Sequence, residues 1–196
     1  MAIELVKPGK KAGGSVEEVI CELIELGKEH LKVTESGRYY RELRINFMIG
    51  KIIRDCNNML GMSGNFKNGC LYREQGLASK WDKASEEVVC DHATPISELV
   101  HAYRFEAVPF EKLIFSPVVR IRKSTNDILT KQGYAQKGHK AGLPLYRYSH
   151  IDVKIVTHLG EEVDPSNWSD RNHWDLVWNT PELHSVLSAL NIRMQA

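Results

Sequence analysis

The sequence lacks the cysteine spacing of a metal-binding knuckle. Its four cysteines are at positions 21, 56, 70 and 90 and form no CxxC pair. A chain of 196 residues can bury a core without disulfides, so we expect free thiols in a reducing cytoplasm. A zinc site made of Cys56, Cys70, Cys90 and His92 is the alternative, and these spacings match no standard zinc finger.

Long apolar runs are also missing. No uninterrupted apolar stretch reaches the length that spans a membrane, and the first residues, MAIELVKPGKKAGG, do not read as a secretory signal. We therefore expect a soluble cytoplasmic protein without a membrane partner. The glycine spacings of a P-loop or a Rossmann fingerprint are absent, as is a GxSxG elbow. These absences argue against a nucleotide-cofactor enzyme and a serine hydrolase of that type.

The formal net charge is only +1, so the whole molecule does not attract nucleic acid strongly. One stretch is locally basic: between residues 120 and 140 only Asp127 opposes seven basic or histidine side chains. Such a face can bind phosphates with salt-dependent affinity. The alternative is an ordinary solvated surface rich in lysine.

The first part of the chain is predicted to be helical. Ser15 and Glu18 form a capping-box pattern in front of an amphipathic run. A second run, from about Tyr39 to Leu60, ends at Gly61, as a helix often does. Residues 61–80 are rich in Gly, Asn and Ser and are interpreted as a connector, with one short helical turn near 72–77. We therefore predict a mostly helical N-terminal region over residues 1–75.

Residues 76–196 are predicted to form an α+β region that carries the candidate site. A short strand ends at Asp91-His92, and Thr94-Pro95 begins a helix. Another strand covers 118–122, followed by a helix with Ser124 as its cap. The stretch IDVKIVTHL predicts a further strand, and a final helix covers 180–190. The predicted fold class is α+β: an N-terminal helical hairpin, then a small mixed region with a ββα-metal-like element and short strands.

Asp91 and His92 carry the strongest chemical signal. At a strand end the backbone turns, so Asp91 can direct its carboxylate at a divalent ion while His92 stays just outside the coordination sphere. A neutral imidazole there can take a proton from an attacking water. A second ligand must come from a later helix, where Asn126 and Asp127 both lie in the first turn. The structural alternative is that Asp91 caps a turn or orients His92.

The stretch DHATPIS resembles the DHxxPLS segment of HNH endonucleases, which are ββα-metal nucleases. More loosely, residues 90–164 are similar to predicted HNH-like proteins of phages and other mobile elements. The resemblance implies Asp91 as a ligand of Mg²⁺ or Mn²⁺, His92 as the general base and Asn126 as a second ligand. The third HNH position has no obvious counterpart, and His139 is the nearest histidine.

Arg120, Arg122 and Lys123 are the candidate nucleic-acid-binding residues, because a guanidinium matches a phosphate with two parallel hydrogen bonds. The predicted function is therefore metal-dependent phosphodiester hydrolysis of DNA. The alternative is a non-catalytic phage or mobile-element protein that binds a host protein or nucleic acid. Two further hypotheses are RNA cleavage by the pair of His92 and His101, and base stacking by the C-terminal tryptophans at 168, 174 and 178.

Overall fold

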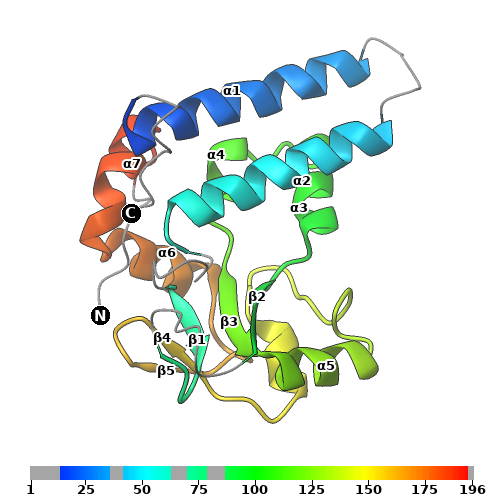
Figure 1. Ribbon diagram of the computed structural model, residues 1–196, viewed down its shortest axis with the longest axis vertical. Coiled ribbons are helices and arrows are strands. Elements are labelled where there is room, and N and C mark those ends of the chain that lie inside the picture. The colour runs from blue at the N-terminus through cyan, green and yellow to red at the C-terminus, as the bar shows by residue number, and fades with distance from the viewer. Residues whose placement is uncertain (1–13, 36–41, 63–69, 79–86, 194–196) are drawn as a thin grey trace.

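A helical hairpin covers a small sheet in this protein. The computed structural model describes residues 14–35, 42–62, 70–78 and 87–193. The hairpin consists of α1 (Val16–Glu35) and α2 (Glu42–Met59), which pack along each other (Figure 1). The predicted capping box is present: the Glu18 N–H donates to Ser15 Oγ at 3.2 Å, and the Ser15 N–H donates to Glu18 Oε2 at 2.8 Å. Gly61 follows α2 with a positive φ of 68°, which favours glycine.

The sheet has five short strands in the order β2-β3-β1-β4-β5. Only the β1–β3 pair is parallel, and the other three pairs are antiparallel. The strands are β1 (Tyr72–Glu74), β2 (Val88–His92), β3 (Val118–Arg122), β4 (Ile155–Thr157) and β5 (Glu162–Val163). The predicted α+β class is confirmed.

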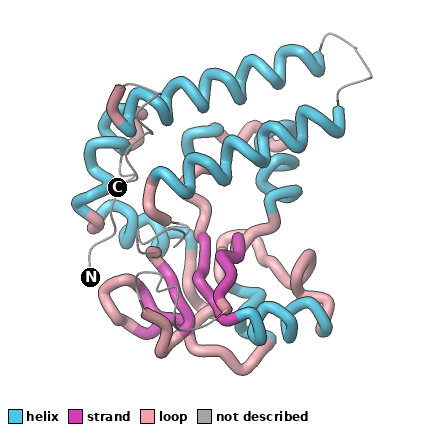
Figure 2. Tube along the Cα trace, in the orientation of Figure 1, coloured by secondary structure: helices cyan, strands magenta, loops and turns pink. Residues whose placement is uncertain are grey.

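Short helices complete the described part of the chain, and Figure 2 shows how they surround the strands. α3 packs against α2, α4 contacts α1 and α3, α7 packs against α1, and α5 follows β3 directly. The sequence therefore places β2, β3 and α5 in ββα order, with α3 and α4 inserted between the two strands. These elements are α3 (Ile96–Phe105), α4 (Phe110–Leu113), α5 (Lys123–Lys131), η2 (Tyr146–His150), α6 (Asp170–Trp178), η3 (Pro181–Leu183) and α7 (His184–Ala189).

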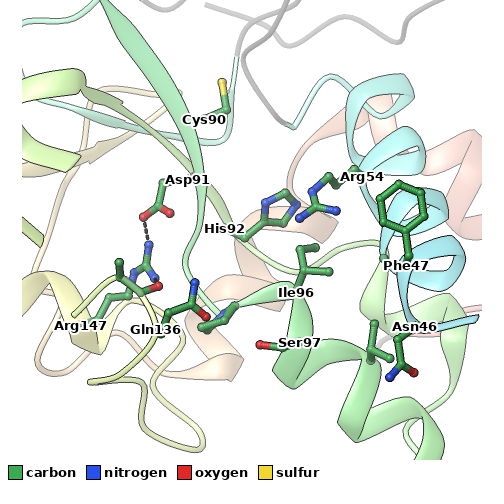
Figure 3. Close-up of a pocket in the computed structure, with 14 residues that line it drawn as sticks. Asn46, Phe47, Arg54, Cys90, Asp91, His92, Ile96, Ser97, Gln136 and Arg147 are labelled. Atoms are coloured by element: carbon green, nitrogen blue, oxygen red, sulfur yellow. Dashed lines mark hydrogen bonds and ion pairs between the residues drawn. The ribbon is translucent and has the colours of Figure 1, made fainter. Parts of the chain in front are cut away.

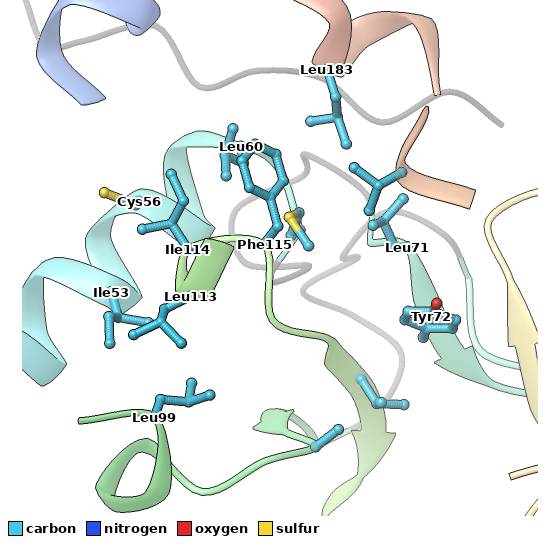
Figure 4. Packing of buried hydrophobic residues seen from close by; sticks show 14 of the residues in the cluster. Ile53, Cys56, Leu60, Leu71, Tyr72, Leu99, Leu113, Ile114, Phe115 and Leu183 are labelled. Atoms are coloured by element: carbon cyan, nitrogen blue, oxygen red, sulfur yellow. The ribbon is translucent and has the colours of Figure 1, made fainter. Parts of the chain in front are cut away.

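One buried apolar cluster joins the helical hairpin to the sheet. Cys56 of α2 and Leu60 just after it belong to this cluster together with Phe115 and with Tyr72 of β1 (Figure 4). β1 comes from the predicted N-terminal region, yet it lies between β3 and β4 in the sheet. The predicted regions 1–75 and 76–196 therefore share a sheet and a core, and their boundary falls in the turn after β1.

Three local predictions were wrong, each for a tertiary reason. Residues 72–74 form a central strand rather than a helical turn, because β3 and β4 flank them on both sides. The strand expected over IDVKIVTHL is limited to β4, since β1 ends at Glu74, which pairs with Ile155. Ser124 lies inside α5, whose N-cap is Arg122 without a side-chain cap.

Further predictions concerned the cysteines, the C-terminal tryptophans and membrane-spanning segments. The four cysteines form no disulfide with one another. The three C-terminal tryptophans pack against the buried cluster, which favours their structural role. Within the described ranges, no helix has both the length and the apolar character needed to cross a bilayer. The strand expected near the N-terminus and the GKKAGG stretch lie outside the described residues.

Candidate functional site

Asp91 and His92 line a pocket of about 580 Å³ between the helical hairpin and the sheet. Four segments form it: α2, the end of β2, the start of α3, and the chain around residues 135–147. Figure 3 shows the Asp91 and His92 side chains pointing in different directions, Asp91 toward Arg147 and His92 toward α2. The predicted Asp-His pair therefore sits at the meeting point of elements that are distant in the sequence.

Asp91 is held by two side chains from η2. Its Oδ2 atom accepts a hydrogen bond from the Tyr148 hydroxyl at 2.6 Å and forms an ion pair with Arg147. The Arg147 side chain is only 1% exposed, so its charge needs this carboxylate. Arg147 Nη1 also donates to the carbonyl of Ala135 at 3.1 Å. Burial raises the pKa of Tyr148 to about 12, so its hydroxyl keeps its proton at neutral pH.

His92 is oriented by a buried amide on α2. Asn57 Nδ2 donates to the carbonyl of Ile114, and a carbonyl can only accept, so the amide orientation is fixed. Asn57 Oδ1 therefore faces His92 Nε2 at 3.0 Å and must accept from it. The neutral ring then carries its proton on Nε2, and the lone pair lies on Nδ1.

The His92 ring is neutral at physiological pH. Burial lowers its pKa to about 4, and the nearby positive charge of Arg54 acts in the same direction. Neutral imidazole is the form that can accept a proton or bind a cation. The geometry thus provides a base at the strand end, with an exposed guanidinium next to it.

Gly50 sets the closeness of α2 and α3 at the pocket wall. A Cβ on Gly50 would lie 2.6 Å from Cγ2 of Ile96. Ile96 is β-branched, so its χ1 angle is restricted and the side chain cannot rotate away without a cost in energy. We expect Gly50→Ala to lower the free energy of unfolding by about 1–3 kcal/mol, measured by urea denaturation. Gly133→Ala is a poor control because its φ is positive, whereas Ser97→Ala changes an exposed pocket residue without a clash. A Gly50→Ala variant as stable as wild type would contradict this close approach.

Asn126 lies at the other end of the β2–β3 pair. Asp91 pairs with Val119, whereas Val88 pairs with Arg122, and α5 begins one residue later. The three residue steps along the strand from Val88 to Asp91 correspond to about 10 Å. Neither Asn126 nor Asp127 lines the pocket, and Asp127 instead borders a second hollow. The structure therefore does not bring Asn126 to the Asp91-His92 pair.

The predicted phosphate-binding residues are already engaged or buried. Arg120 is 2% exposed, and Arg122 forms an ion pair with Glu74, whose other oxygen accepts from the Arg122 N–H at 2.9 Å. Lys123 is exposed and forms an ion pair with Glu87 at 2.8 Å. These three residues follow each other along β3 and α5 but do not form one exposed cationic face. Their role in binding nucleic acid stays a prediction.

A divalent cation shared by Asp91 and Asn126 does not fit these positions as they lie. The Asp91 carboxylate faces Arg147 and Tyr148, and Asn126 is at the far end of the strand pair. Among the described residues, no three His, Cys, Asp or Glu side chains gather closely enough to hold a metal ion. This also applies to the alternative zinc site. A requirement for Mg²⁺ or Mn²⁺ stays a prediction.

Three residues that shape the pocket were missed from the sequence: Asn57, Arg147 and Tyr148. Asn57 gave a signal, because it is a polar residue one helical turn from Ile53 and next to Cys56 on the apolar face of α2. Arg147 and Tyr148 stand in a segment punctuated by Gly and Pro, which favoured a plain loop. Only their burial, which the sequence does not reveal, marks them as partners of an acid.

Comparison with known proteins finds no match: no protein-family model matches the chain, and no curated protein or solved structure is significantly similar to it. The resemblance to HNH endonucleases therefore rests on the residues of this chain alone.

Proposed function

We propose that the protein hydrolyses phosphodiester bonds in DNA, with His92 as the general base. One observation supports this most: the His92 ring is neutral, its Nε2 atom is tied to Asn57, and its Nδ1 lone pair remains for a proton. The order of β2, β3 and α5 fits the ββα-metal-like element that the resemblance implies. Cysteines without disulfides suit a cytoplasmic protein that meets DNA there.

The chemistry assigns a part to each side chain. His92 Nδ1 takes a proton from the water that attacks phosphorus, and the phosphorus–oxygen bond to the leaving nucleoside breaks. The leaving oxygen then gains a proton from solvent. Arg54, exposed beside His92, neutralises the negative charge of the phosphate. The Asp91–Arg147 pair fixes the end of β2 and thereby the backbone of His92.

The predicted Mg²⁺ or Mn²⁺ enters this proposal as a condition to be tested. Arg147 now holds the carboxylate that would bind the cation, so a cation at Asp91 must compete with a buried guanidinium. Cleavage that depends on added Mg²⁺ or Mn²⁺ would mean that the cation wins this competition.

We expect His92→Ala to lower the rate of DNA cleavage at least about 100-fold, because the proton acceptor is lost. The measurement is cleavage of labelled single-stranded DNA and of plasmid DNA with Mg²⁺, with Mn²⁺ and with chelator. His139→Ala is a matched control, since its ring is exposed outside the pocket. Wild-type protein without activity on either substrate under all three conditions would reject hydrolysis, as would a His92→Ala variant with unchanged rates.

The engagement of Asp91 favours a second candidate, a non-catalytic protein that binds nucleic acid or a host protein. If the ion pair between Arg147 and Asp91 persists, Asp91 does not bind a cation. The pocket then binds a phosphate without a metal centre. Binding of DNA without cleavage, weakened by added salt, would support the nucleic-acid version. A stable protein complex, unaffected by Arg54→Ala, would support the host-protein version.

A further inference from the structure

Phe47 contributes little burial of apolar surface to the fold, because its ring is mostly exposed to solvent. Its side chain is 65% exposed, more than any other large apolar side chain in the described ranges. It nevertheless lines the rim of the His92 pocket. Figure 3 shows Phe47 and Arg54 projecting from the same helix, with Arg54 beside His92. An aromatic face and a guanidinium thus share the entrance to the candidate site.

Phe47 and Arg54 lie on the same side of α2 because of their spacing along the helix. Phe47, Gly50 and Arg54 are three and seven residues apart, which places them along one side of α2. The opposite side carries Ile49, Ile53 and other buried residues of the core. Between Phe47 and Arg54, Gly50 lets Ile96 of α3 pack close to α2, and all three residues line the pocket with Ile96.

The chemistry of this rim matches a nucleotide. An aromatic ring stacks on a base whatever its identity, and a nearby cation attracts the phosphate. Asn46, Ser97 and Gln136 also line the pocket and offer hydrogen-bonding groups for a base edge. The volume of about 580 Å³ lies within the range of sites that enclose a small organic ligand.

A base in a duplex has both faces covered by its neighbours, so a protein ring reaches a base face only when the nucleotide is unpaired or extruded. We propose that the pocket binds an unpaired nucleotide of single-stranded DNA, with its base against Phe47 and its phosphate at Arg54. This inference rests on the proposed function, because it names the DNA form that the His92 site accepts.

Fluorescence anisotropy tests the inference with a labelled oligothymidylate, in chelator so that binding is observed apart from any metal-dependent cleavage. Phe47→Ala should weaken binding about tenfold, the loss expected for one stacked base. Arg54→Ala should weaken binding and also reduce its salt dependence by about one phosphate contact. Phe105→Ala is the matched control: it removes a ring that is 63% exposed but lies outside the pocket, and its affinity should equal that of wild type.

Two further probes separate base stacking from phosphate attraction. An abasic strand of equal length should bind wild type and Phe47→Ala equally, and a blunt duplex should bind wild type more weakly than the single strand. Equal affinity of wild type and Phe47→Ala for oligothymidylate, or tighter binding of the duplex, would overturn the inference. Circular dichroism confirms that each variant is folded.

The two proposals can fail separately. Single-strand binding that depends on Phe47, without cleavage under any condition, would keep this inference and reject hydrolysis. Cleavage of plasmid DNA that requires His92 but is unchanged in Phe47→Ala would keep hydrolysis and reject the unpaired nucleotide.

Discussion

Asp91→Ala should lower the free energy of unfolding by about 3–5 kcal/mol, the cost of leaving one partner of a buried ion pair alone. Arg147 is only 1% exposed and cannot recover water when its carboxylate is removed. The Tyr148 hydroxyl loses its acceptor in the same substitution. Urea denaturation followed by fluorescence at neutral pH measures the loss.

The surface pair of Lys51 and Asp55 provides the matched control. It joins two exposed side chains one helical turn apart, so Asp55→Ala should cost only about 0.3–0.5 kcal/mol. Arg147→Met in the Asp91→Ala background should restore much of the lost stability, because the buried charge then disappears with its partner. If Asp91→Ala costs no more than Asp55→Ala, the pair is not buried as described.

The Asp91–Arg147 ion pair also determines what substitutions at Asp91 and His92 can reveal about the candidate site. It connects the end of β2 to η2, and the bond from Arg147 to Ala135 extends the connection to the segment before η2. Asp91 therefore stabilises the fold through this ion pair, whether or not it also binds a cation. A substitution at Asp91 that abolishes cleavage does not by itself identify a metal ligand, whereas His92→Ala leaves the Asp91–Arg147 pair in place and reports on the base alone.

Local patterns predicted much of the fold. The Ser15 capping box and the Gly61 helix end are recognisable because each depends on residues that are close in the sequence. The same holds for the Asp91-His92 strand end and for the start of α3, although its N-cap is Pro95 rather than Thr94 and no side chain caps it. These features follow from backbone geometry within a few residues, and a single sequence contains that information.

Long-range pairings could not be predicted in the same way. β1 has only three residues, and its identity as a strand depends on β3 and β4. Nothing near Asp91 indicates that Arg147 will reach it, because a salt bridge has no periodic signature. Asn126 was expected beside Asp91 because the HNH resemblance takes a second metal ligand from the helix that follows the second strand. The register instead places the start of α5 beside Val88, and order alone does not reveal that.

The second large effect concerns acid stability and His173 on α6. His173 Nε2 donates to the carbonyl of Phe115 at 2.7 Å, so its Nδ1 atom accepts from the Tyr72 hydroxyl at 2.8 Å. That hydroxyl accepts in turn from Trp168 Nε1 at 3.0 Å. The buried network is satisfied only while the ring is neutral, and burial lowers the pKa of His173 to about 4.

Acidification should therefore destabilise the protein. Between the ordinary histidine pKa of about 6.5 and the folded value of about 4, the unfolded chain holds a proton on His173 that the folded chain refuses. The stability that His173 contributes is complete above pH 6.5, is lost as the pH falls through this window, and changes no further below pH 4. The shift corresponds to a loss on the order of 3 kcal/mol, visible as a lower urea midpoint at pH 4.5 than at pH 7.

Variants separate His173 from the other histidines. Burial also lowers the pKa of His92, to about 4, and that of His158, so His173→Gln should lose the contribution of His173 and keep the pH dependence that His92 and His158 cause. His101→Gln removes a ring that is 55% exposed and should follow the wild-type curve. If His173→Gln loses as much stability as wild type between pH 7 and pH 4.5, the proton is taken up elsewhere. In that case, disruption of the hydrogen-bond network around Tyr72 is not the cause of the lower free energy of unfolding at low pH.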